Sequence, residues 1–303
     1  MPIPPVSISV RLGFAALAAS LLAGCSPLSL FATFTPKDPA PRRASGLAYG
    51  PGPRQALDVY PPPAATAGPA PIAVFFYGGG WDSGRRQDYG WAGRSLAAQG
   101  FLTVVPDYRI YPQARFPAFL EDGAAALRWA QDHGSAFGGD PTRIVLVGHS
   151  AGAYNAVMLA LDERYLRHAG ADPGRIRAVA GLAGPYDFLP LKSKITLRAF
   201  GAAPDLKATQ PIAFARRAAP PMFLAAGDDD RLVGPYNTRH LAAALRAAGA
   251  EVEERHYPGM DHPGSALALS RPFRARSPLF AEMTDFLRRH ANVITGPVNS
   301  PRP

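Results

Sequence analysis

The stretch that most constrains this chain runs from Ile144 to Ala156 and reads I-V-L-V-G-H-S-A-G-A-Y-N-A. Four aliphatic residues typical of a buried strand lead into the spacing G-x-S-x-G around Ser150. Glycines on both sides allow the backbone to reverse from strand to helix, which exposes a serine held in a strained conformation. The alternative is an ordinary glycine-bounded turn. The strand pattern before Ser150 and the alanine-rich helical pattern after it favour a nucleophile.

The rest of the chain repeats a strand–helix rhythm, which predicts a mostly parallel sheet of about eight strands with helices on both faces. Two short strands are expected within Gly46–Tyr60. Further strands are expected over Ile72–Tyr77, Phe101–Val105, Ile144–Val147, Ile176–Leu182, Pro220–Ala226 and Glu251–His256. Helices are expected over Tyr89–Gln99, Pro117–His133, Ala151–Leu161, Tyr236–Ala248 and Ser277–His290.

A glycine loop follows the first buried strand, in the order Tyr77-Gly78-Gly79-Gly80-Trp81. Three glycines expose backbone N–H groups without side-chain obstruction, so the loop can direct two donors at a negatively charged oxygen. A phosphate-binding loop is the other possibility. The loop lacks the lysine of G-x-x-x-x-G-K-[ST] and the spacing G-x-G-x-x-G, which argues against a nucleotide site.

A serine hydroxyl needs a base to take its proton and an acid to orient that base. His262 is the preferred base because it follows the last strand, in a loop. His256 falls within that strand, and His133, His240 and His290 lie in or at the ends of expected helices.

Three consecutive carboxylates, Asp228-Asp229-Asp230, follow the strand before that one. Their side chains point in different directions, so only one of them can face the imidazole. Asp230 is preferred because it stands three residues after Gly227, far enough around the turn to point back over the sheet edge. Asp187 and Asp261 are outside candidates.

Together these motifs resemble the α/β-hydrolase fold of esterases and lipases, in particular hormone-sensitive-lipase-like carboxylesterases, feruloyl esterases and kynurenine formamidases. The resemblance runs from about Gly46 to His290, with the order Ser150, Asp230, His262 and with Asp107-Tyr108-Arg109 after a strand. The family's oxyanion loop reads His-Gly-Gly-Gly. The resemblance therefore implies that the N–H groups of Gly79, Gly80 and Ala151 bind the oxyanion. This chain departs from the family at Tyr77, where the family has histidine.

Composition adds limits on partners. The net charge is +9, and only four of the 32 basic residues are lysines. The arginines are scattered rather than gathered in a stripe with aromatic platforms, which argues against nucleic-acid binding and fits a solvated surface biased toward anionic membranes. The chemistry implies no cofactor and no metal. The oligomeric state is open.

The N-terminus resembles a bacterial lipoprotein signal. Arg11 precedes the apolar stretch Leu12–Ala23, which is too short to span a bilayer, and Leu22-Ala23-Gly24-Cys25 resembles a lipobox. The resemblance implies cleavage after residue 24 and acylation of Cys25. Ser26 after it resembles an outer-membrane sorting signal. A buried or incidental free cysteine is the other possibility.

We therefore expect a signal peptide over 1–24, a flexible tether over 25–44, a catalytic domain over 45–292 and a disordered tail over 293–303. Residues 188–218 lack a strand pattern and are expected to form a small helical cap. The expected activity is hydrolysis of small or short-acyl carboxylic esters at the cell envelope. The alternatives are amide or formamide hydrolysis, or a catalytically silent lipoprotein that uses the fold for binding.

Overall fold

A computed structural model describes residues 27–63 and 68–292. Its eight strands form one sheet in the order β1-β2-β4-β3-β5-β6-β7-β8. β2 pairs antiparallel with both β1 and β4, and all the other pairs are parallel. The strands are β1 (Ala44–Ala48), β2 (Ala56–Tyr60), β3 (Ala70–Phe76), β4 (Leu102–Pro106), β5 (Gly139–His149), β6 (Ile176–Leu182), β7 (Met222–Gly227) and β8 (Val252–Tyr257). The expected α/β-hydrolase architecture is confirmed.

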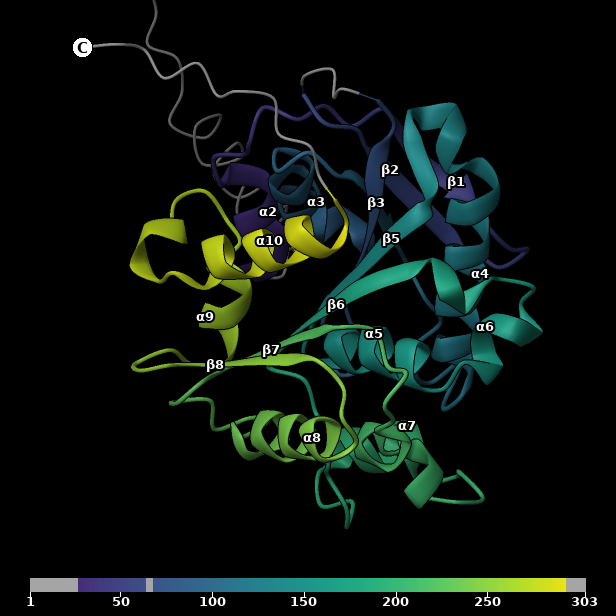
Figure 1. Cartoon of the computed structure of the whole chain (residues 1–303), viewed down its shortest axis with the longest axis vertical. Helices are drawn as coiled ribbons and strands as arrows, with labels where there is room; N and C mark the ends of the chain where they lie inside the picture. The colour runs from purple at the N-terminus through teal and green to yellow at the C-terminus, as the bar shows by residue number, and fades with distance from the viewer. Residues whose placement is uncertain (1–26, 64–67, 293–303) are drawn as a thin grey trace, which may run out of the picture.

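The helices cover both faces of the sheet. They are α2 (Pro27–Phe34), α3 (Gly90–Ala97), α4 (Ala118–His133), α5 (Ala151–Leu161), α6 (Arg164–His168), α7 (Lys194–Phe200), α8 (Tyr236–Ala247), α9 (His262–Leu267) and α10 (Leu279–His290). Figure 1 shows α3 and α10 on one face of the sheet, with α4, α5 and α8 on the other. None of the helices within the described residues is long and apolar enough to cross a membrane.

The central strands are buried along their whole length, as their apolar sequences predict. Every residue of β3, A-P-I-A-V-F-F, is buried, and β4 and β7 are buried throughout as well. Such runs suit parallel strands covered by helices on both faces. The edge strand β1 is half-exposed to exposed. One continuous apolar core therefore fixes the carboxyl ends of the central strands, where the candidate site residues lie.

Helix α2 corrects the expected tether. Residues 25–44 were expected to be flexible because they are rich in Pro, Ser and Thr, yet Pro27–Phe34 is helical and packs on the domain. The ring of Phe31 meets the ring of Trp91 edge-on, with centroids 5.4 Å apart. Apolar burial thus orders a segment whose polar composition suggested a linker. The expected signal peptide over 1–24, Cys25 and the expected tail over 293–303 lie outside the described residues.

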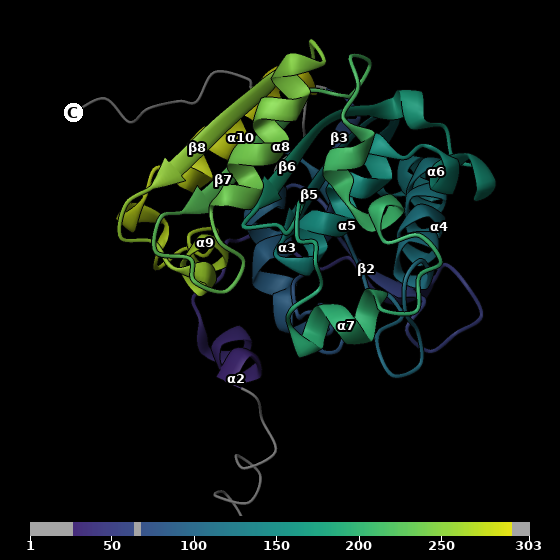
Figure 2. The ribbon, with the colours of Figure 1, turned by 90° about the horizontal axis from the view of Figure 1, so that it is seen from below.

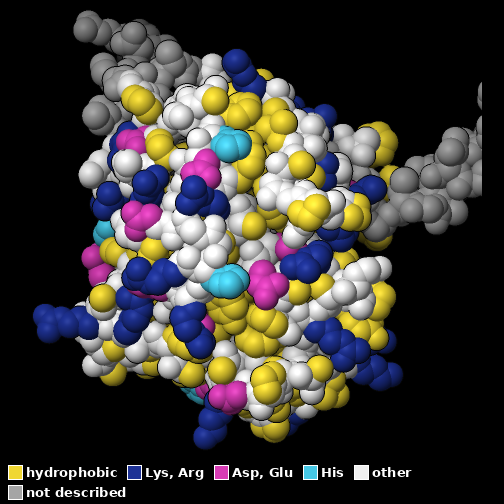
Figure 3. Space-filling view, turned by 90° about the vertical axis from the view of Figure 1, so that its right-hand side faces the viewer, with side chains coloured by type: hydrophobic (Ala, Val, Ile, Leu, Met, Phe, Trp, Pro, Cys, Tyr) yellow, Lys and Arg dark blue, Asp and Glu magenta, His cyan; other side chains and the backbone are white. Residues whose placement is uncertain are grey.

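On the face in Figure 3, Lys and Arg side chains are dispersed among apolar and acidic ones rather than gathered in one stripe. Several arginines across the molecule pair with nearby carboxylates, such as Arg128 with Asp132 and Arg246 with Glu254. Much of the positive charge is therefore locally compensated.

Candidate active site

Ser150 lies at the sharp turn between β5 and α5, as its motif predicts. Its φ of 56° is in the left-handed region, which a residue with a Cβ rarely adopts. A Cβ on Gly148 would lie 2.2 Å from the oxygen of Gly152, and a Cβ on Gly152 would lie 2.0 Å from the oxygen of Phe76. The two glycines are therefore required by close backbone contacts, and the strained turn that they allow presents the Ser150 hydroxyl at the sheet edge.

His262 and Asp230 form a hydrogen-bonded chain with Ser150, as the sequence predicts. The Ser150 Oγ and the His262 Nε2 are 2.9 Å apart, and the His262 Nδ1 is 2.7 Å from the Asp230 Oδ2. Since a carboxylate only accepts, Nδ1 carries the proton and Nε2 is free to accept from the serine hydroxyl. All three residues are at most 9% exposed. His262 begins the short helix α9 rather than lying in a loop.

The environment of Asp230 keeps it ionised. Burial raises the pKa of this carboxyl, but hydrogen bonds from His262 and from the amides of Val233 and Leu232 outweigh burial, so the pKa lies below its ordinary value. Both amides donate to the Oδ1 at 3.0 Å. One oxygen is thus held by the backbone while the other faces the imidazole.

The rival residues lie elsewhere. Asp228 and Asp229 are exposed, and Asp261 caps α9 by accepting from the Gly264 amide. Asp187 pairs with His240 at 2.7 Å, and His256 pairs with Glu254 at 2.9 Å. None of these described residues hydrogen-bonds to the hydroxyl of Ser150, so the structure brings together only the preferred acid and base.

The glycine loop lies beside the serine. A Cβ on Gly78 would lie 3.1 Å from the Cβ of Ser150. Gly79 and Gly80 have positive φ values of 128° and 59°, and the carbonyl of Gly79 accepts from the amides of Asp82 and Ser83. Together with Ala151, these glycines line the cavity that contains Ser150. The structure therefore brings all three expected oxyanion residues to the serine.

Trp81 braces the far side of this loop. It is only 2% exposed although it has a φ of 57°, and its indole N–H donates to the Asn155 Oδ1 at 3.1 Å. Its carbonyl accepts from the Tyr111 amide at 2.7 Å. Asn155 belongs to α5, so the helix that begins at the serine also holds the end of the loop.

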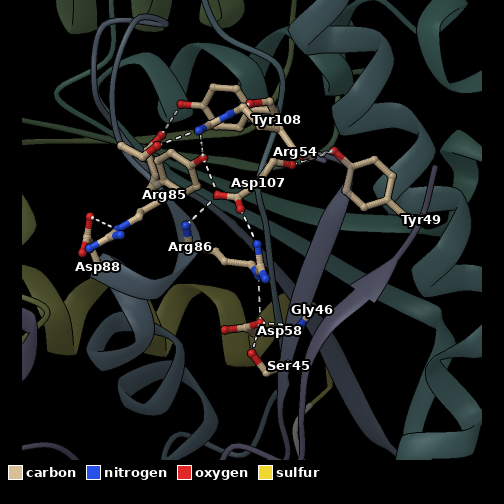
Figure 4. A network of polar contacts seen from close by, with 12 residues as sticks. Ser45, Gly46, Tyr49, Arg54, Asp58, Arg85, Arg86, Asp88, Asp107 and Tyr108 are labelled. Carbon is tan, nitrogen blue, oxygen red and sulfur yellow. Dashed lines mark hydrogen bonds and ion pairs between the residues drawn. The ribbon is translucent and has the colours of Figure 1, made fainter. Parts of the chain in front are cut away.

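Tyr77 hydrogen-bonds to Arg54 and Asp107 at the start of the loop, and Figure 4 shows these two partners in a polar network with Tyr108. Its hydroxyl donates to the Asp107 Oδ1 at 2.7 Å and accepts from the Arg54 Nη2 at 2.9 Å. The same Arg54 nitrogen donates to the carbonyl of Gly84 at 2.7 Å. The Tyr108 hydroxyl donates to the Tyr77 carbonyl at 2.7 Å. Arg54 therefore joins the two ends of the loop. Tyr77, which replaces the histidine of the resembled family, makes the hydrogen bonds that hold the start of the loop.

The network continues inward through Arg86, which Figure 4 shows between two carboxylates. Its Nη1 pairs with Asp107 and its Nε pairs with Asp58 at 2.8 Å. Asp58 also accepts from the Ser45 hydroxyl and the Gly46 amide, both at 2.9 Å. Each buried charge is thus paired and hydrogen-bonded, the condition under which burial of charge is tolerated.

His149, the residue before Ser150, contacts the backbone of His262. Its Nε2 donates to the carbonyl of His262 at 3.1 Å. Burial, and then the neighbouring His262, lower its pKa from 6.5 to about 3. His149 is therefore a neutral donor that fixes the backbone of His262.

Ser150 lines a mostly apolar cavity of about 860 Å³. Residues 188–218, which contain α7, contribute Phe188, Leu189, Pro190 and Ile195 to its lining. Among the described residues, no group of three or more His, Cys, Asp or Glu side chains is placed to hold a metal ion.

Sequence reasoning missed Arg54, His149, Asn155 and the contribution of α2. Asn155 had a local signal, because it is a polar residue in an otherwise apolar helix, A-G-A-Y-N-A-V-M-L-A-L. Arg54 had none, since its partners lie on loops far along the chain.

The family described as BD-FAE matches residues 57–245, which is more than half of the chain. The chain belongs to the BD-FAE family. The match spans the glycine loop and Ser150 but ends before His262. Helix α2 also lies outside it.

Curated relatives resemble this BD-FAE chain over most of its length. Esterase LipC of Mycobacterium tuberculosis is 31% identical over 71% of this chain and 58% of the relative. Isoprenylcysteine alpha-carbonyl methylesterase ICME of Arabidopsis thaliana is 28% identical over 81% of this chain and 62% of the relative. The chain thus spans less than two thirds of the length of these relatives.

Solved structures share the fold. A truncated carbohydrate esterase from gut microbiota has a TM-score of 0.75 at 20% identity, covering 85% of this chain and 99% of that one. Esterase B from Lactobacillus rhamnosis has a TM-score of 0.74 at 19% identity, covering 93% and 97%. At these identities the likeness shows the α/β-hydrolase fold alone.

Proposed function

We propose that this chain hydrolyses carboxylic esters through an acyl-enzyme. The observation that carries the proposal is the Ser150–His262–Asp230 chain, with contacts of 2.9 and 2.7 Å, beside a glycine loop. The names of the relatives, an esterase and a methylesterase, support the same reaction class.

In the proposed mechanism, the Ser150 Oγ attacks the ester carbonyl as His262 Nε2 takes its proton. The N–H groups of Gly79, Gly80 and Ala151 stabilise the negative oxygen, each being worth roughly 3 kcal/mol in the transition state. The imidazolium then gives its proton to the leaving alcohol, and Asp230 holds the ring and balances its charge. Water attacks the acyl-serine by the same route in reverse and releases the acid.

The substrate proposed here is a small or short-acyl ester. Hydrolysis of p-nitrophenyl acetate and butyrate by the purified protein, compared with Ser150→Ala, tests the reaction. We expect turnover that the variant lacks. Equal rates for the two proteins would overturn the proposal. Faster turnover of an aryl formamide than of the matched ester would favour the formamidase alternative, and no turnover of either would favour a binding protein.

We also propose that Cys25 is acylated and anchors the protein in the cell envelope, at an outer membrane and facing the periplasm. The support is the Leu22-Ala23-Gly24-Cys25 pattern. Because α2 begins at Pro27 and packs on the domain, two residue steps separate it from Cys25, at most about 7 Å of extended chain. Fractionation tests this proposal: the wild type should sediment with membranes and Cys25→Ala should not.

A further inference from the structure

We propose that Leu28 and Phe31 of α2 form the end of a subsite for an apolar group of the substrate, and so set how long that group can be. The inference rests on the proposed ester hydrolysis and names a part of the substrate that this site selects. It concerns a segment outside the family match, which begins at residue 57.

Helix α2 forms a wall of the catalytic cavity. Pro27, Leu28 and Phe31 line the same space as Ser150 and His262. Leu28 and Phe31 are half-buried and pack against the core. Figure 2 shows α2 on the same side of the molecule as α7, the helix of residues 188–218. An N-terminal helix and the cap thus contribute different parts of one enclosure.

Two polar contacts hold this wall in place. The Ser29 hydroxyl donates to the Asp88 Oδ1 at 2.9 Å. Beyond the helix, the buried Asp38 accepts from the Arg274 guanidinium at 3.1 and 2.9 Å and from the Ser95 hydroxyl at 3.0 Å. Helix α2 is therefore anchored through Ser29 in its middle and through Asp38 beyond its end, which gives it a defined position relative to the serine.

The chemistry of this end selects an alkyl or aryl group. Phe31 packs on Trp91, which packs on Tyr89, and the lining of the cavity also includes Ala266 and Leu267; none of these side chains is charged. The charged carboxylate and ammonium groups of the lining, Asp82 and Lys192, come from the glycine-loop and cap segments. A charged or strongly hydrated group placed against α2 would lose water without gaining a partner. Each methylene buried here should raise kcat/KM by roughly fourfold until the space is full.

Two series of esters separate the possible sources of this group. The acyl chain is varied in p-nitrophenyl esters from acetate to decanoate, and the alcohol is varied in acetate esters from ethanol to decanol. Leu28→Trp should shorten the tolerated chain in one series, lowering kcat/KM for the longest well-used ester at least tenfold while the shortest ester changes by less than threefold. Leu28→Ala should extend the tolerated chain in the same series. Whichever series responds identifies the group as acyl or alcohol.

Phe34→Ala is the matched control, because Phe34 lies on the same helix but is 76% exposed and does not line the cavity. Its chain-length profile should equal that of the wild type. Phe31→Leu keeps an apolar side chain against Trp91 but reaches less far into the cavity, so it should extend the tolerated chain as Leu28→Ala does. It serves as a second test if the Leu28 variants do not fold.

Unchanged profiles in both series for folded Leu28 and Phe31 variants would overturn the inference, as would an equal loss on all chain lengths. A wild-type protein that turns over no ester would instead overturn the proposed function, so the two failures are distinct.

Discussion

The two walls of the cavity are built on different principles. The glycine-loop wall is held by buried charges and directed hydrogen bonds, from Arg54 and Tyr77 through Asp107 to Arg86. The wall made by α2 and residues 188–218 is lined largely by apolar side chains that pack ring on ring, as between Phe31 and Trp91 and between Phe188 and Phe200. Its polar anchors, such as the bond from Ser29 to Asp88, lie beside this packing.

The difference matches what each wall is proposed to do. Oxyanion donors act only within narrow distances, so their loop needs contacts that fix direction. An apolar group of a substrate needs a pocket of matching shape that excludes water, and it needs no directed hydrogen bonds. Packed apolar side chains are enough for this, and they can be exchanged for others of similar size. Mutations on the polar wall should therefore change kcat, and mutations on the apolar wall should change which ester is used.

The largest effect on the polar side should come from Asp230→Asn. The amide cannot hold the His262 tautomer that leaves Nε2 free to accept, so kcat for a short ester should fall on the order of 10⁴-fold. Asp229→Asn is the matched control, because the neighbouring carboxylate is exposed. Similar kinetics for the two variants would show that Asp230 is not the orienting acid.

A smaller loss should follow Tyr77→Phe, which removes the hydroxyl that joins Arg54 to Asp107. The oxyanion donors remain but are held less firmly, so kcat should fall roughly tenfold, less than for removal of a donor, with KM unchanged. Tyr165→Phe, a Tyr→Phe change on α6, should leave both constants as they are. A rise in KM with constant kcat would mean that the network shapes the substrate wall instead.

The pH dependence of stability tests the burial of His149. Its pKa is about 3 when folded and 6.5 ordinarily, so on acidification the unfolded chain takes up a proton that the folded chain refuses. The free energy of unfolding should therefore fall as the pH drops from about 6.5 toward 3, by up to about 1.4 kcal/mol per pH unit from this group. Urea unfolding of the wild type and His149→Gln measures it. The variant should show a flatter profile, and parallel profiles would contradict the assignment.

The smallest effect should come from His240→Gln, which breaks the exposed pair with Asp187 at the start of the cap segment. The two side chains are 52% and 35% exposed, so the pair should stabilise the protein by less than about 1 kcal/mol. Urea unfolding and kcat should both stay close to wild type. A large loss of stability would show that ion pairs, and not ring packing, hold residues 188–218 in place.

Much of the fold followed from local patterns. The buried strands and Ser150 were predictable because an apolar run followed by G-x-S-x-G specifies its own conformation. The positions of Asp230 and His262 followed from the rule that parallel strands end at one edge of the sheet.

The features that could not be predicted from the sequence depend on contacts between segments far apart in the chain. Pro27–Phe34 has few signals of its own, and its helix is fixed by Trp91 and Phe273, which lie far along the chain. In the sequence, Arg54 is one of many scattered arginines. Its contacts with Tyr77 and Gly84 form only when the loops fold together.

The central claim is that Ser150 is the nucleophile, and covalent labelling tests it most directly. A fluorophosphonate probe, followed by mass spectrometry of the labelled peptide, should place one adduct on Ser150 in the wild type and none in Ser150→Ala. Labelling that persists at another residue, or a folded wild type that does not react, would contradict the account.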